Sequence, residues 1–324
     1  MVKTNRLGTL AAARGALGAV GLLMLLMLVV GVQPSEATFP GKNGRIVFER
    51  QQWLGPLVGY GPVKIFAIRP DATGLKRVTK GSTPNFSPNG RRIAFVRLDQ
   101  FGVEDIYIKS PWDTGKVRNV TKTQNSYELS PAWSPDGRQI AFERRGEIDK
   151  INADGTNERR LTELDTQARD FEPSWSPDGS QIVFVRYEND QTTGEFFIDL
   201  FVMNADGTGE RRLTDRVPPN CNRLSPAWSP DGNKVVFEYI CNAVGNGIYV
   251  VNADGTGQQR LTNTLDLDPV WSPNGRQIAY ISANAGFYDL YVMLADGTNP
   301  TNITNSPEVD EQNPSWQPKP LSDG

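Results

Sequence analysis

The chain has 324 residues, 38% of them hydrophobic, and a formal net charge of −3. This length suits one large domain or two modest ones, and the charge gives no basic face of the kind that nucleic-acid-binding proteins use. Histidine is absent, which excludes a Ser-His-Asp triad, a Cys-His pair, a histidine-ligated zinc ion and an imidazole base.

The first segment, residues 1–37, has the pattern of an export signal. Three basic residues precede an uncharged apolar run at 16–32, and residues 35–37 (Ser-Glu-Ala) fit the small-x-small cleavage pattern. We therefore expect cleavage before Thr38 and an exported protein, located in the periplasm, the cell envelope or outside the cell. The alternative is an uncleaved anchor helix, for which the run is short. We expect membrane contact only through such a segment.

Short alternating segments begin at residue 41. Residues 45–48 (Arg-Ile-Val-Phe) and 64–68 (Lys-Ile-Phe-Ala-Ile) are rich in β-branched and aromatic residues, a pattern typical of half-buried strands. Residues 77–79 (Arg-Val-Thr) close this first unit. Unlike the later units, it has no Pro-x-Trp segment ahead of it.

A compound motif then recurs along the chain. It begins with Pro-x-Trp-Ser-Pro-Asp-Gly or a variant, continues with an alternating segment such as Gln-Ile-Ala-Phe, and ends with an Ala-Asp-Gly turn and Arg-Leu-Thr. Asp-Gly and Asn-Gly predict tight hairpin turns. The aromatic residue of the motif stands at Phe86, Trp133, Trp175, Trp228, Trp271 and Trp316. Successive spacings of 47, 42, 53, 43 and 45 residues suit four short strands, the content of one propeller blade.

The last segment, residues 313–316 (Asn-Pro-Ser-Trp), is the opening strand of a unit with nothing after it. We predict that this strand joins the first unit as its innermost strand and so closes the ring. Five complete units and one split unit then give an all-β, six-bladed β-propeller of four-stranded antiparallel blades over residues 38–318. Residues 319–324 are predicted to be a C-terminal tail.

The compound motif resembles the TolB-type propeller repeat, also called WD40-like or PD40, over nearly all of residues 39–318. The resemblance implies a propeller domain. TolB also carries an N-terminal α/β domain, for which we expect no room between the signal segment and Gly41, so we do not expect the Tol–Pal partner role to transfer safely. Similar repeats in prolyl oligopeptidase relatives gate an α/β-hydrolase domain, which we do not expect here, since the sequence has neither such a domain nor a histidine.

The repeated residues have structural interpretations. We expect the tryptophans to pack blade against blade, because aromatic side chains dominate core burial, and the aspartates to form turns rather than bind metal.

The long insertions all fall on one predicted face, and we expect a partner to bind there. These insertions are residues 51–63, 98–103, 186–197, 215–224 and 240–247. Their aromatic residues are Trp53, Tyr60, Phe101, Tyr187 and Phe196; the alternative is that these pack on their own loops.

The two cysteines, Cys221 and Cys241, both belong to this face. We predict a disulfide between them, because an oxidising compartment permits one. The alternative is a pair of free thiols.

Acidic residues recur at two positions ahead of the aromatic residue. We expect them to surround the channel mouth, where their field would attract a cation or a basic peptide; ordinary solvated acidic residues are the alternative. The acidic residues at the fifth position before the aromatic residue are Glu128, Asp170, Asp266 and Glu311. The acidic residues at the third position before it are Glu172 and Asp268. We assign no catalytic residue, no metal ligand and no cofactor. Binding of a Ca²⁺ ion in the channel is an alternative that the sequence leaves open.

These observations favour a monomeric, non-catalytic scaffold that binds a protein or peptide on its loop-rich face. One alternative is a carboxylate-based propeller hydrolase acting on glycans, which needs no histidine. The Asp-Gly turns, however, lack the following aromatic residue of sialidase Asp boxes. Another alternative is binding of a small ligand or cation by oxygen ligands in the channel.

Overall fold

The computed structural model describes residues 38–113, 115–163, 168–190, 192–218, 221–241, 245–284 and 286–319, with only the backbone described at residue 284. These residues belong to one compact unit. The predicted signal segment, residues 1–37, lies outside the described residues. So does the predicted tail, apart from Lys319.

The described residues form strands and turns and contain no helix. In chain order the strands are β1 (Lys42–Gln52), β2 (Lys64–Ile68), β3 (Lys76–Lys80), β4 (Ser82–Phe86), β5 (Ile93–Leu98), β6 (Glu104–Lys109), β7 (Arg118–Asn119), β8 (Glu128–Trp133), β9 (Gln139–Arg144), β10 (Glu147–Asn152), β11 (Arg159–Arg160), β12 (Ala168–Trp175), β13 (Gln181–Asn189), β14 (Phe196–Asn204), β15 (Arg211–Arg212), β16 (Cys221–Trp228), β17 (Lys234–Cys241), β18 (Gly247–Asn252), β19 (Gln259–Arg260), β20 (Asp266–Trp271), β21 (Gln277–Asn284), β22 (Phe287–Leu294), β23 (Thr301–Asn302) and β24 (Val309–Lys319).

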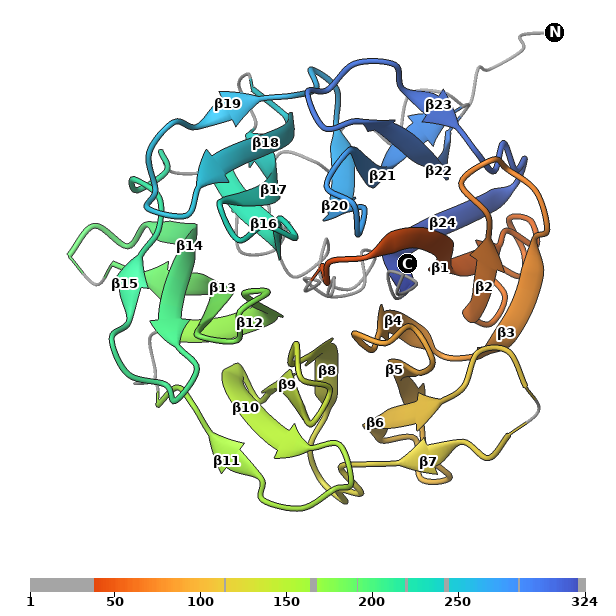
Figure 1. The fold of residues 1–324 in the computed structure, drawn as a ribbon, viewed down its shortest axis with the longest axis horizontal. Helices are drawn as coiled ribbons and strands as arrows, with labels where there is room; N and C mark the ends of the chain where they lie inside the picture. The colour runs from red at the N-terminus through yellow and green to blue at the C-terminus, as the bar shows by residue number, and fades with distance from the viewer. Residues whose placement is uncertain are drawn as a thin grey trace, which may run out of the picture. The chain divides into compact units, whose positions relative to one another are not determined.

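The strands form four sheets of four strands and one sheet of eight, in which two groups of four meet at a single parallel pair, Ile198 and Asn222. Each group of four is named here by its second strand. The groups are the β1 sheet (β24, β1, β2, β3), the β5 sheet (β4–β7), the β9 sheet (β8–β11), the β13 group (β12–β15), the β17 group (β16–β19) and the β21 sheet (β20–β23). Figure 1 shows the groups around a common centre, with β4, β8, β12, β16 and β20 each the strand of its group nearest to it. The first strand in the order of each group, β24 included, is here called the inner strand.

Each inner strand is the Pro-x-Trp segment of one repeat, and it ends at or near the aromatic residue. The C-terminal strand β24 pairs antiparallel with β1, so that Trp316 lies opposite Ile46 and Ser315 opposite Val47. The predicted pairing of the last strand with the first unit is therefore confirmed.

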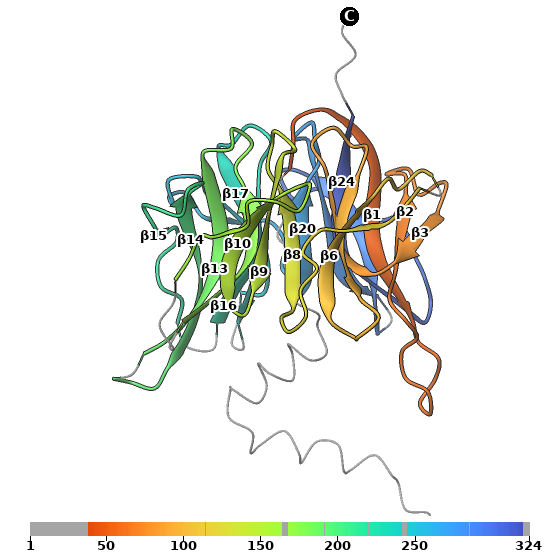
Figure 2. The same cartoon turned by 90° about the horizontal axis from the view of Figure 1, so that it is seen from below.

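The groups have two different ends, because successive strands run in opposite directions. The turn end carries the Ser-Pro-Asp-Gly and Ala-Asp-Gly turns, and the loop end carries the connections from second to third strand and from one group to the next. In the side view of Figure 2, the connections after β1 (orange) and after β13 (green) project farthest at the loop end. Part of the predicted insertion 186–197 is strand, because β13 continues to Asn189 and β14 begins at Phe196.

The turns form as their residue types predict. In the β9 sheet, Asp136 accepts hydrogen bonds from the Ser134 hydroxyl at 2.6 Å and from the Arg138 N–H at 3.0 Å. Gly137 has a φ of 68°, which glycine adopts without steric cost. Asp178 and Asp231 make the same contacts in later repeats, which confirms the turn-forming role of these aspartates.

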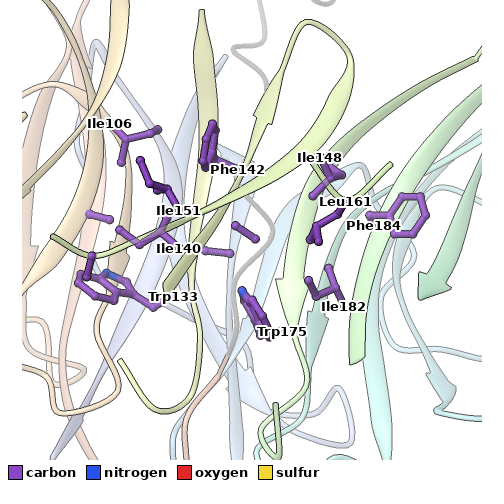
Figure 3. Packing of buried hydrophobic residues seen from close by; sticks show 14 of the residues in the cluster. Ile106, Trp133, Ile140, Phe142, Ile148, Ile151, Leu161, Trp175, Ile182 and Phe184 are labelled. Atoms are coloured by element: carbon purple, nitrogen blue, oxygen red, sulfur yellow. The ribbon is translucent and has the colours of Figure 1, made fainter. Parts of the chain in front are cut away.

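The core lies between neighbouring groups. Trp133 is 1% exposed and belongs to one apolar cluster with Ile106 of the β5 sheet and Ile140 of its own sheet. Figure 3 shows this cluster continuing to Trp175 and Phe184 of the β13 group. Truncating such a buried aromatic side chain costs about 3–5 kcal/mol. The predicted packing of the tryptophans between units is confirmed.

Candidate functional site

Each inner strand contains one β-bulge, at the residue three positions before its aromatic residue. At these six residues φ lies between 46° and 55°, a region uncommon for residues other than glycine. They are Thr83, Ser130, Glu172, Ser225, Asp268 and Asn313. A proline follows each of them. Proline cannot donate to a ladder and is tolerated in sheets at edges or bulges, and the bulge removes the preceding N–H from the ladder.

Several of these N–H groups donate to a carboxyl of the preceding group. The Ser225 N–H donates to Glu172 of the β13 group at 2.7 Å, and the Asp268 N–H donates to Glu238 of the β17 group at 2.9 Å. The Asn313 N–H donates to Asp268 of the β21 sheet at 3.0 Å. The carboxyls thus link neighbouring groups where their inner strands meet.

Glu49 of β1 extends these links to the β5 sheet. It accepts a hydrogen bond from the Thr83 N–H at 2.5 Å and another from the Asn313 side-chain amide. The hydrogen bonds at the bulges therefore run without interruption from the β13 group to the β5 sheet. We call Glu49, Glu172, Glu238 and Asp268 the inner carboxyl cluster.

Burial raises the pKa of every member of this cluster. The pKa of Glu49 rises to about 7, that of Asp268 to about 7 and that of Glu238 to about 8. The pKa of Glu172 lies well above its ordinary value, through burial and through the nearby Glu238. Removal from water disfavours the charged form, so the cluster retains protons near neutral pH.

Sequence reasoning missed two of these residues, Glu49 and Glu238, together with Glu143. Each of the three directly follows the aromatic residue in the second strand of its group, which is β1, β17 or β9. In the second strands of the other three groups, β5, β13 and β21, the same position holds valine or isoleucine. This alternation is visible in the sequence and is the signal that could have found them. Burial raises the pKa of Glu143 to about 8, and among the described residues its Oε2 atom is buried without a hydrogen-bond partner.

Four of the predicted acidic residues stand at the fifth position before the aromatic residue of their repeat. Three of these four are fully buried and form ion pairs. Glu128 pairs with Arg144 at 2.9 Å. Asp170 accepts two bonds from Arg186, at 2.6 and 2.7 Å. Glu311 pairs with Arg50 at 3.1 Å. In each pair the arginine lies on the second strand of the same group, so these contacts join two strands rather than face solvent.

Burial outweighs the arginine at Asp170, where it raises the pKa to about 6. The fourth residue of this set, Asp266, is also buried and accepts a hydrogen bond from the Thr264 hydroxyl at 2.7 Å. Arg223 occupies the equivalent place in the β17 group and pairs with Asp199 at 3.0 Å. All six predicted acidic residues are thus buried and have hydrogen-bond partners within the fold. A binding role for them stays a prediction.

The aromatic residues of the loop end divide into two kinds. Trp53 and Tyr60 pack edge to face with ring centroids 4.9 Å apart, and Tyr187 and Phe196 stack at 5.4 Å. Phe101 is 76% exposed. The four paired residues support the self-packing alternative, and Phe101 is available for an external contact.

The predicted disulfide between Cys221 and Cys241 is present. Cys221 begins β16 and Cys241 ends β17, and the two residues lie directly opposite each other in the strand register. The disulfide therefore fastens the loop end of one hairpin.

The comparisons with known proteins bear on this architecture. The family model of the TolB beta propeller domain matches residues 75–222 and 220–321. The chain belongs to this family. The resemblance drawn from the repeats is therefore confirmed. A search of curated proteins gave no match.

Several solved structures are similar in fold to this TolB-type chain. TolB from Acinetobacter baumannii is 22% identical, over 91% of this chain and 70% of that one, with a TM-score of 0.69. Kuenenia stuttgartiensis hydrazine synthase is 15% identical, over 87% of this chain and 48% of that one, with a TM-score of 0.70. A chain of a nidogen/laminin complex is 12% identical, over 86% of this chain and 100% of that one, with a TM-score of 0.62. These identities show the fold alone.

Within the residues that the structure describes, no group of three or more His, Cys, Asp or Glu side chains is placed to hold a metal ion. No helix among them is long and apolar enough to span a membrane. A pocket of about 470 Å3 opens at the turn end, beside Trp271, Pro230 and Asp296, away from the loop end.

Proposed function

We propose that this protein is an exported, non-catalytic scaffold that binds a protein or peptide partner at its loop end. In this proposal the groups of four strands are the blades of a six-bladed propeller, and β24 closes the ring. The family and the pairing of β24 with β1 support this architecture. The Cys221–Cys241 disulfide is consistent with an oxidising compartment.

The burial of the acidic residues carries the functional part of the proposal. All six predicted site residues accept hydrogen bonds or pair with arginines inside the fold. A partner at these carboxyls would have to displace internal contacts. The projecting hairpin β13–β14 and the disulfide-fastened hairpin β16–β17 offer a more accessible surface, since rigid scaffolds commonly bind through their loops.

A photo-crosslinking experiment in the native host tests this proposal. A crosslinking side chain at Thr193, in the β13–β14 connection, is expected to capture one specific protein. The matched position Asp206, exposed in the turn between β14 and β15, is expected to capture none. Capture from Asp206 alone, or from neither position, would contradict binding at the loop end.

A carboxylate-based hydrolase is the second candidate, and Glu143 is the observation that favours it. A carboxyl that keeps its proton near neutral pH can act as a general acid. Glu143 has a raised pKa, and its Oε2 atom has no hydrogen-bond partner among the described residues. Release of sugar from a glycan panel by the wild type, lost in Glu143→Gln, would replace the scaffold proposal with this one.

A further inference from the structure

Large apolar side chains are exposed on two neighbouring connections at the loop end. In the connection between β1 and β2, Leu54, Leu57 and Val58 are 50%, 99% and 67% exposed. Leu98 and Phe101, where β5 turns into β6, are 57% and 76% exposed. We call these five residues the apolar tips. They belong to adjacent sheets (Figure 1), and soluble proteins rarely expose such groups of apolar residues without a function.

The first tip is held in a defined conformation. The Leu54 N–H donates to the Gly59 carbonyl at 2.8 Å, and the Gly59 N–H donates to the Gly55 carbonyl at 2.9 Å. At the base of the connection, the Trp53 N–H donates to the Glu308 carbonyl at 2.8 Å. The exposure of Leu57 is therefore a property of an ordered turn that projects from the domain (Figure 2).

The second tip is ordered in a similar way. Asp99 accepts hydrogen bonds from the N–H groups of Phe101 at 2.7 Å and Val103 at 2.9 Å. These bonds occupy the Asp99 carboxylate within its own turn and fix the backbone that carries the exposed Phe101. Both tips are thus preorganised, which lowers the entropic cost of an external contact.

The residues behind the tips change character in layers. The aromatic pair Trp53 and Tyr60 lies at the base of the first tip. Behind it, the exposed basic residues Lys80, Arg97 and Lys122 stand at the loop end of the same two sheets, at or beyond the ends of β3, β5 and β7. This order matches the layers of a bilayer surface. The apolar tips correspond to the acyl chains, Trp and Tyr to the interfacial region, and Lys and Arg to the phosphate groups.

We propose that the apolar tips insert into an anionic lipid surface. The tips are convex and lie on two separate turns, so a protein partner would need two matching hollows, whereas a bilayer yields to any convex apolar shape. The basic residues behind them complement anionic head groups. This membrane contact is separate from residues 1–37, which are the only segment for which the sequence predicted a membrane contact. It is also separate from the protein partner proposed at the β13–β14 connection.

The chain contains its own control. The β13–β14 connection also projects at the loop end (Figure 2) but carries polar residues, among them Asp190, Thr193 and Glu195. An environment-sensitive fluorophore placed at Val58→Cys or at Thr193→Cys in the full chain reports on each connection separately. The native cysteines form a disulfide, and any membrane contact made by residues 1–37 leaves the two labels distinguishable.

Vesicles of phosphatidylethanolamine with phosphatidylglycerol should shift the emission of the label at position 58 to the blue, and brominated acyl chains should quench it. The label at position 193 should show neither change. Leu57→Asp combined with Phe101→Asp should raise the lipid concentration for half-maximal shift by at least about tenfold, because each apolar side chain would lose its transfer into the bilayer. Thr192→Asp combined with Thr193→Asp should leave it unchanged.

Replacement of Lys80 and Arg97 by Gln should weaken the response to anionic vesicles and leave the response to pure phosphatidylcholine vesicles unaltered. An unchanged label at position 58, equal responses at both positions, or equal binding of anionic and phosphatidylcholine vesicles would overturn the proposal. A response at position 58 only to a captured protein would also overturn it. Unchanged circular dichroism of each variant shows that folding is intact.

Discussion

At the scale of single residues, the inner carboxyl cluster links the stability of the domain to pH. The folded-state pKa values of Glu49, Glu238 and Asp268 are about 7 to 8, whereas a carboxyl in an unfolded chain has a pKa of about 4. Between these values the folded chain binds more protons than the unfolded chain. The free energy of unfolding therefore falls as the pH rises through this window.

We expect urea unfolding to give a larger free energy at about pH 5 than at about pH 8.5. Glu238→Gln, which is neutral at every pH, should flatten this dependence by at least about 1 kcal/mol across the window, because it removes one of the titrating groups. The exposed residue Glu163 provides the control, and Glu163→Gln should leave the profile as in the wild type. A wild-type protein that gains stability with rising pH would refute this assignment.

The sequence showed where the acidic residues recur but not what surrounds them. The spacing of Glu128, Asp170 and Glu311 predicted equivalent places in successive units, as observed. It did not predict the arginine partners, because those lie on the following strand of each group. Nor did it predict the bulge at Glu172, which depends on how a strand accommodates the next residue, a proline.

At the scale of the elements, the β16–β17 hairpin depends on its disulfide. Cys221 and Cys241 are 20 residues apart in the sequence, and their bond restricts the unfolded chain more than the folded one. The sequence predicted this bond correctly. It predicted the strand lengths less well, because the polar residues of β13 up to Asn189 resemble a loop and are ordered as strand by pairing with β14.

Replacement of both cysteines by serine should lower the free energy of unfolding by about 3 kcal/mol, through the entropy that the unfolded chain regains. Denaturant unfolding measures this change. A reducing agent should lower the stability of the wild type to that of the double variant and have no effect on the variant. Equal stability of the oxidised wild type and the variant would show that the bond does not constrain the hairpin.

At the scale of the whole molecule, the β1 sheet is assembled from both ends of the described chain. The repeats predicted this arrangement because Trp316 opens a unit that nothing completes, and β24 is found beside β1. Trp316 also belongs to an apolar cluster with Ile46 of β1 and Val270 of β20. The strand thus holds the first and last groups of the chain together.

A chain that ends at residue 308 should self-associate. Loss of β24 leaves β1 with an unpaired edge and removes the buried Trp316, and an exposed strand edge is a template for pairing with other chains. Light scattering measures the association, and a chain that ends at Lys319 is the matched control. A monomeric, cooperatively folded product after removal of β24 would show that this strand is dispensable.

The pairing of β24 with β1 also has a consequence for the order of events during synthesis. Among the described strands the ribosome makes β1 first and β24 last, so the first sheet lacks its inner strand until all the other described strands have been made. Contacts between such distant segments carry a large loop-closure cost and form slowly. A chain exported as the sequence predicts would thus remain incompletely folded, and able to pass a narrow translocation pore, until β24 has been made.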